Sequence, residues 1–249
     1  MYYTEEQTQK LYDNYKDFLI RYDKIFEKFL TLKLEVLRAN EFLQHGFLRR
    51  LKTIKNCIDD IFDIYPPERT ELLTDDERHI LEISAQAIVI HVFGCLDDLA
   101  WIYKEEKNIK INKLNVSLFK NKFQNQINNK IFIDFLNNEK IKSWFDNTCK
   151  DNRDAIAHRI PIYIPPVQVL PENLKRYEEI EGILRTETDF KKRQKLYEEQ
   201  DNLSIICPIY RHSIGENAPL LYLHQQLIDD VRTVFLIAEM FFDAFRLTH

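Results

Sequence analysis

Glycine is scarce in this sequence: it accounts for 4 of 249 residues, against 17 phenylalanines and 12 tyrosines. Folds built from many short strands need many tight turns, where glycine is a favoured residue. The scarcity therefore argues against a β-sandwich and for long helices. The glycine-rich phosphate-binding loops, the nucleophile elbow Gly-x-Ser-x-Gly and the zinc-protease motif His-Glu-x-x-His are also missing.

Cysteine is equally sparse, and its spacing excludes the common cysteine sites. No two of the four cysteines lie close together, so the sequence holds no Cys-x-x-Cys metal or redox motif. We expect reduced thiols in a cytoplasmic protein. The four are Cys57, Cys95, Cys149 and Cys207.

Long hydrophobic runs are missing too. The polar, acidic N-terminus does not resemble a signal peptide. The longest apolar stretch without a charged residue, Ile83 to Leu96, is shorter than the ~20 residues that a membrane-spanning helix needs. It is therefore expected to be a core helix, with no membrane as a partner.

The charge balance also disfavours one class of protein. The net charge is −5, whereas proteins that bind nucleic acid mainly through charge are usually basic. The exception is residues 104–142, which hold nine lysines and nine asparagines against four acidic residues. Such a stretch is usually a solvated surface, but a basic face that contacts phosphates would look the same.

Helical periodicity dominates the N-terminal half. Apolar residues at helical spacing predict one amphipathic helix over 5–45, a break at Gly46 and a second helix over 47–64, stopped by Pro66-Pro67. Residues 1–66 then form an N-terminal helical extension.

A capping box opens the next helix. Thr74 and Glu77 have the spacing at which each side chain bonds the other's backbone N–H, so we expect a helix over 75–106. Its middle is apolar almost all round, which predicts the central helix of a bundle. Further helices are expected near 117–126 and 131–136, over 139–158 and over 223–247.

Residues 160–217 form an insertion. Three prolines make 160–170 extended, and 203–213 looks extended as well, so the two could pair at the foot of a charged helical hairpin over 172–202, broken near 186–188. The expected fold is all-α: an antiparallel helical bundle in a single domain, with the extra N-terminal helices, the inserted hairpin and at most a small two-stranded ribbon.

One short motif suggests a chemistry. Arg153 is followed directly by the polar Asp154, and His158 comes five residues after the arginine. This pattern resembles the signature of the HEPN superfamily, and the resemblance covers roughly 75–158 and 220–247. A second arginine–histidine pair, Arg38 with His45, lacks the polar residue after the arginine.

The resemblance implies a dimeric helical bundle that binds RNA. Many HEPN proteins are metal-independent endoribonucleases of toxin–antitoxin or phage-defence systems, and an antitoxin-like protein would then be a partner. Others are non-catalytic dimeric modules that bind a protein or nucleotide. The sequence leaves both functions open.

The residue types fit metal-free RNA cleavage. A histidine transfers protons near neutral pH, and an arginine offers phosphate a planar fork of donors. By this hypothesis Arg153, Asp154 and His158 are the catalytic residues, with no metal or cofactor. On an ideal helix Arg153 and His158 point about 140° apart. Two copies facing one cleft would solve this problem, so we expect a homodimer.

Simpler explanations of these and other polar residues are available. His158 could cap helix carbonyls, and Arg153 could pair with Asp154 or Asp151. Asp97 and Asp98 could form salt bridges near the motif. His91, Cys95 and Asp98 share a helix face, yet no fourth metal ligand is evident. Tyr210-Arg211-His212 could extend a phosphate site or form an exposed edge, and Asp229 and Asp230, beside His224, could simply favour a helix N-terminus.

Overall fold

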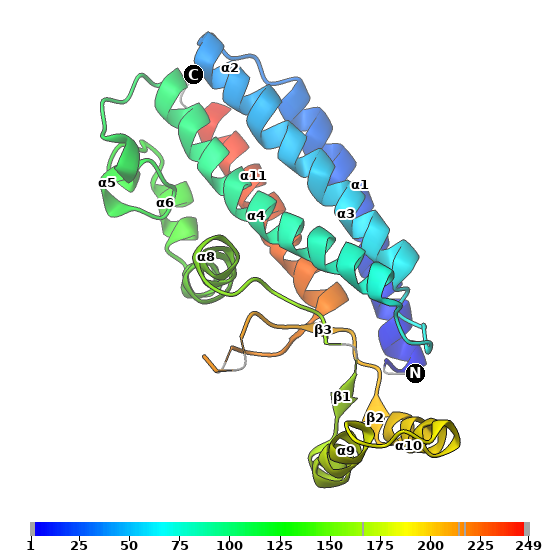
Figure 1. Cartoon of the computed structure of the whole chain (residues 1–249). Helices are drawn as coiled ribbons and strands as arrows, with labels where there is room; N and C mark the ends of the chain where they lie inside the picture. Colours follow the sequence, from blue (N-terminus) through cyan, green and yellow to red (C-terminus); the bar gives the residue numbers. More distant parts are fainter. Residues whose placement is uncertain (1–2, 166, 214, 217, 247–249) are drawn as a thin grey trace.

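The computed structural model describes residues 3–165, 167–213, 215–216 and 218–246. Four long helices form the body of the molecule (Figure 1): α1 (Glu5–Leu30), α3 (Leu48–Ile64), α4 (Asp75–Glu106) and α11 (Leu223–Arg246). In the described residues the strands are two residues long and form two-stranded ribbons. The predicted all-α fold is therefore confirmed.

The long helices alternate in direction only in the first half of the chain. Tyr15 stacks on Phe62 near the end of α3 and Phe29 contacts Phe47 just before its start, so α1 and α3 are antiparallel, and α4 runs back along α3. The closing helix α11 departs from this alternation because it runs parallel to α1: Asn14 bonds Gln225 near one end, and Lys28 pairs with Asp243 near the other.

The predicted helix over 5–45 is wrong in its middle. The helix α1 ends at Leu30, and a new one begins with α2 (Leu37–Glu41). Between them, the Glu106 carboxylate accepts hydrogen bonds from the backbone N–H groups of Glu35 and Val36, at 2.8 and 3.0 Å. A side chain 70 residues away in the sequence thus organises the new helix start.

The predicted break at Gly46 is also wrong. A continuous helical run leads from α2 through the π-helical η1 (Phe42–Phe47) into α3. A Cβ atom on Gly46 would lie 2.7 Å from the carboxylate of Asp98 on α4. The glycine therefore serves a close approach between two helices and does not end one.

The central helix begins and ends as predicted. In α4 the Glu77 N–H donates to the Thr74 hydroxyl at 3.2 Å, and the Thr74 N–H donates to the Glu77 carboxylate at 2.8 Å. Arg69 pairs with the same carboxylate at 2.9 Å. This capping box fixes the start of the helix.

The lysine-rich stretch is better ordered than a solvated loop. It contains η2 (Lys113–Asn115), α5 (Asn121–Gln124) and α6 (Lys130–Leu136), which bury Phe123, Phe132 and Leu136 while the lysines stay largely outside. The predicted helix over 139–158 follows as α7 (Glu139–Trp144), the π-helical η3 (Phe145–Cys149) and α8 (Lys150–His158).

The insertion forms the predicted hairpin. The helices α9 (Pro171–Leu184) and α10 (Phe190–Asn202) stand on the ribbon of β1 (Gln168–Val169) and β2 (Ser204–Ile205), which pair antiparallel. A second ribbon pairs β3 (Ile209–Tyr210) with β4 (Leu221–Tyr222), directly before α11. Leu247, the predicted last residue of the closing helix, lies outside the described residues.

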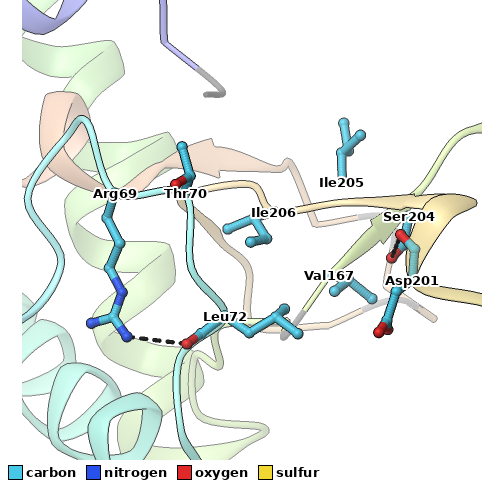
Figure 2. Close-up of a pocket in the computed structure, with 8 residues that line it drawn as sticks. All are labelled: Arg69, Thr70, Leu72, Val167, Asp201, Ser204, Ile205 and Ile206. Atoms are coloured by element: carbon cyan, nitrogen blue, oxygen red, sulfur yellow. Dashed lines mark hydrogen bonds between the residues drawn. The ribbon is translucent and has the colours of Figure 1, made fainter. Parts of the chain in front are cut away.

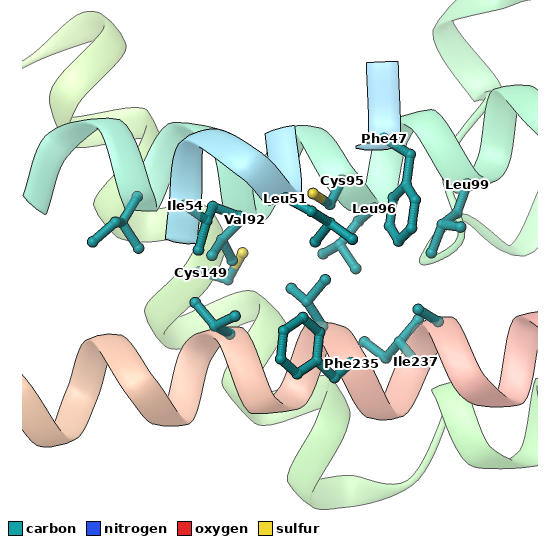
Figure 3. Close-up of a cluster of buried hydrophobic side chains, with 14 of the residues drawn as sticks. Phe47, Leu51, Ile54, Val92, Cys95, Leu96, Leu99, Cys149, Phe235 and Ile237 are labelled. Atoms are coloured by element: carbon teal, nitrogen blue, oxygen red, sulfur yellow. The ribbon is translucent and has the colours of Figure 1, made fainter. Parts of the chain in front are cut away.

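The core lies where α3, α4, α11 and η3 meet (Figure 3). Side chains from all four interdigitate, among them Leu51, Cys95, Cys149 and Phe235, each at most 3% exposed. By length and composition α4 would pass for a membrane-spanning helix. Core helices pass the same test, and α4 packs against α3, α8 and α11.

Candidate functional site

The motif arginine lies in a cleft beside α4. The cleft holds about 420 Å³, and the turn of α8 that follows η3 directs Arg153 into its wall. A π-helical segment adds a residue to the helical turn, and such segments are frequent at functional sites. The lining residues are Phe93, Asp97, Val116, Ser117, Phe119, Lys120, Phe145, Asp146, Lys150 and Arg153.

Arg153 is held in place on two sides. Its guanidinium carbon lies 3.9 Å from the centre of the Phe93 ring, and Nη1 pairs with Asp154 at 2.9 Å. Its Nε is buried and has no hydrogen-bond partner in the described part of the chain. The ring and the carboxylate therefore fix the plane of the guanidinium and leave donor capacity unused.

The rest of the cleft combines aromatic rings with positive charge. Phe119 and Phe145 stack with their centres 3.8 Å apart, and Phe145 stacks on Phe93 at 5.8 Å. Lys120 and Lys150 add two ammonium groups to the Arg153 guanidinium, against the carboxyl groups of Asp97 and Asp146, and the Lys120 ammonium also donates to the Leu114 carbonyl. Apolar rings and convergent cations are the features that bind a nucleobase and its phosphate.

Asp97 is a residue that sequence reasoning undervalued. It was expected at most to form a salt bridge, yet none joins it to the described residues, although it lines the same cleft as Arg153. Burial raises the pKa of its carboxyl to about 6, and Arg153 only partly opposes this. Asp97 can therefore carry a proton near neutral pH.

The three predicted site residues are not brought together in one chain. The Asp154 carboxylate pairs with Arg153. The Lys150 ammonium lies 3.9 Å from the same carboxylate, which is too far for a hydrogen bond. His158, in the last turn of α8, is exposed, does not line the cleft and has no bond with the described residues. The expected divergence of Arg153 and His158 is thus present.

Asp98 forms the salt bridge that was expected near the motif. Its carboxylate, 8% exposed, accepts from Arg50 Nε at 2.8 Å, and Arg50 also reaches His91 at 3.1 Å. A Cβ atom on Gly94 would lie 2.5 Å from the Arg50 guanidinium, so a larger residue here would displace that side chain from Asp98. Arg50 occupies the space between His91 and Asp98, and no metal-ligand cluster is found among the described residues.

Neither alternative for Tyr210-Arg211-His212 holds, because the segment is packed under α8. Tyr210 and His212 are buried, and Arg211 bonds the backbone carbonyls of Ser213 and Ala218. His212 lies 3.4 Å from Asp151 and 3.6 Å from Glu216. Arg159 pairs with the same two carboxylates, so this cluster ties the insertion to α8.

The polar residues of α11 are structural. His224 is buried, and its Nε2 lies 2.6 Å from the carbonyl oxygen of Tyr65. Asp230, expected to act on the helix dipole, is instead buried and accepts hydrogen bonds from Trp144 at 2.7 Å and Gln226 at 2.8 Å. It therefore anchors α7 to α11.

In two other clefts the arginine is already engaged. One of about 440 Å³ lies at the foot of the hairpin (Figure 2), but its arginine, Arg69, already bonds Ile64, Leu72 and Glu77. A smaller one of about 190 Å³ holds the second arginine–histidine pair; there Arg38 pairs with Glu41 at 2.6 Å.

Comparison with known proteins adds no identity: no protein-family model, no curated protein and no solved structure matches this chain. The resemblance to the HEPN superfamily therefore rests on Arg153, Asp154, His158 and the helices that carry them.

Proposed function

We propose that this chain is a cytoplasmic HEPN-type RNA-binding protein that cleaves RNA without a metal, in a toxin–antitoxin or phage-defence setting. The observation that carries the proposal is the cleft itself. It places the motif arginine, two lysines and stacked phenylalanine rings around one space.

Within this proposal Arg153 binds the phosphate. Asp154 and Phe93 orient its guanidinium, and the guanidinium donors that Asp154 does not engage would bind the phosphate oxygens. Lys120 and Lys150 would bind neighbouring phosphates, and the lysines of 104–142 would extend the basic face despite the net charge of −5.

The proposal has a direct test. Purified protein incubated with total RNA should cleave it, and cleavage should persist in EDTA because no metal-ligand cluster is found in the described residues. Attack by the 2′-oxygen on the phosphorus should release the 5′-oxygen and leave a 2′,3′-cyclic phosphate, detectable by mass spectrometry. If the RNA stays intact although the protein is folded, the nuclease proposal is refuted.

Arg153→Lys should damage cleavage although it keeps the charge. A lysine ammonium cannot bind phosphate through a planar fork or hold the same stack on Phe93. We expect a fall of about 10²–10³ in kcat/KM, as for the loss of one oriented donor to a developing charge. Asp154→Ala, which removes only the orienting carboxylate, is the matched variant and should lose less. Equal activity of Arg153→Lys and wild type would contradict the phosphate role.

A homodimer is proposed because one chain does not bring His158 to the cleft. The aromatic residues of the long helices are mostly in the core and do not supply the interface. The outer face of α4 does expose aliphatic side chains: Ile83 is 55% and Ile80 is 45% exposed. The chain that follows His158 runs along this face, where Gln86 donates to the Ile162 carbonyl at 2.9 Å.

Sedimentation should therefore show a dimer that Ile83→Asp dissociates. Leu30→Asp, at an equally exposed position on α1, is the control and should leave the dimer intact. A wild-type monomer at concentrations on the order of tens of micromolar would count against the proposal, since the dimer would then be weaker than ~6 kcal/mol.

A second candidate function is a non-catalytic dimeric module that binds a protein or nucleotide partner. It is favoured by one observation: Arg153 is already engaged by Asp154 and Phe93, as in a purely structural arginine. This alternative predicts that the wild type cleaves no RNA and that motif variants change only stability or partner binding.

A further inference from the structure

The inserted hairpin is a projecting arm with its own internal bracing. The helices α9 and α10 leave the bundle through the β1–β2 ribbon and extend away from it (Figure 1). Between them Ile180 is fully buried, and Arg176 pairs with Glu199 at 2.7 Å. At the far end Arg193 donates to the carbonyls of Leu184 and Glu187, which closes the turn.

Charge is strongly segregated along this arm. Residues 185–195, which form its far end, contain five cations and two carboxylates, a net charge of +3. The rest of the two helices contains two cations and seven carboxylates, a net charge of −5. A helix of 14 residues is roughly 21 Å long, more than two Debye lengths in physiological salt. Charges at the outer end of the arm are therefore largely screened from charges at its base.

The far end also exposes apolar surface. Phe190, at the start of α10, is 78% exposed, and Ile183 on α9 is 42% exposed. Lys191 and Lys195 lie one helical turn apart on α10, about 100° and 140° around the helix axis from Phe190, and neither forms an ion pair with a described residue. A phenylalanine ring this exposed contributes little burial to the folded state, so folding alone does not explain its position.

We propose that this arm tip, residues 183–195, is a second RNA-binding surface that holds the phosphate backbone while Phe190 stacks on an unpaired base. The inference rests on the proposed function, because it assigns the same ligand as the Arg153 cleft. Free cations and an exposed aromatic ring on the same short helical turn are features that retain single-stranded nucleic acid, with the cations on the backbone and the ring on a base. The acidic base of the arm would repel the strand and so confine its contact to the tip.

The test measures affinity for an oligouridylate with 2′-O-methyl groups, which lacks the attacking hydroxyl and cannot be cleaved. Lys191→Glu/Lys195→Glu should weaken binding at least about tenfold and reduce the salt slope by about 1–2. Phe190→Ala should weaken binding about fivefold or more, as for the loss of one stacked base. Lys175→Glu, the same substitution at one exposed lysine at the base of the arm and half the charge change of the double variant, is the control and should have little effect.

The outcomes separate the two proposals. If the wild type binds the oligouridylate and the tip variants bind like Lys175→Glu, the arm assignment falls while the cleft proposal stands. If Phe190→Ala alone has no effect, base stacking falls. If the wild type does not bind but a polyglutamate peptide does, through the tip lysines, the surface serves an acidic protein and both RNA proposals fail.

Discussion

His158→Ala should reduce RNA cleavage by about 10²–10⁴, the usual loss for a proton-transfer group. In this role the imidazole is the general acid that protonates the leaving 5′-oxygen. Because His158 is exposed and has no bond with a described residue, the substitution should hardly change the free energy of unfolding. Loss of activity would then report chemistry and not misfolding.

The measurement is single-turnover cleavage of a labelled RNA together with an unfolding curve for each variant. The chain offers a matched control in His45→Ala, an exposed histidine of the second arginine–histidine pair, which should cleave like the wild type. If His158→Ala stays fully active while Asp97→Asn does not, proton transfer belongs to the cleft carboxyl and the motif histidine has no catalytic role.

The second large effect concerns stability. Burial raises the pKa of Asp230 to about 7, although Trp144 and Gln226 donate to its carboxylate. An unfolded aspartate ionises near pH ~4, so between about pH 4 and 7 the folded chain keeps a proton that the unfolded chain has lost. Asp230 alone should therefore lower the free energy of unfolding by roughly 4 kcal/mol as the pH rises through this window.

Asp230→Asn should remove most of this fall. The asparagine keeps an acceptor oxygen for the Trp144 indole and carries no charge, so at pH 8 the variant should be more stable than the wild type by about 2–4 kcal/mol. Near pH 4 the two should be alike. A fall between about pH 4 and 6 should remain in the variant, because burial also raises the pKa values of Asp97 and Asp98 to about 6.

Urea unfolding at several pH values provides the measurement. Asp229→Asn, at the neighbouring and half-exposed position, should retain the wild-type slope. If Asp230→Asn is less stable than the wild type at pH 8, the buried carboxylate contributes more as an ion than its burial costs, and the explanation is wrong.

Local sequence signals determined most of the secondary structure. The Thr74–Glu77 capping box set the start of α4, because both of its bonds lie within four residues. The prolines of 160–170 prevented a helix there, and the charged segment over 172–202 formed the predicted hairpin. These features depend on interactions between residues that are close in the sequence, so they can be predicted without the tertiary structure.

Only the tertiary structure decided the features that depend on distant partners. Glu106 organises the helix start at Val36, Asp98 explains Gly46, and the direction of α11 follows from its packing along α1. The same distinction between local and distant interactions applies to the candidate site. The sequence identified Arg153, but the cleft, its phenylalanine rings and the raised pKa of Asp97 arise from segments that meet only on folding, since burial and proximity are not properties of a linear chain.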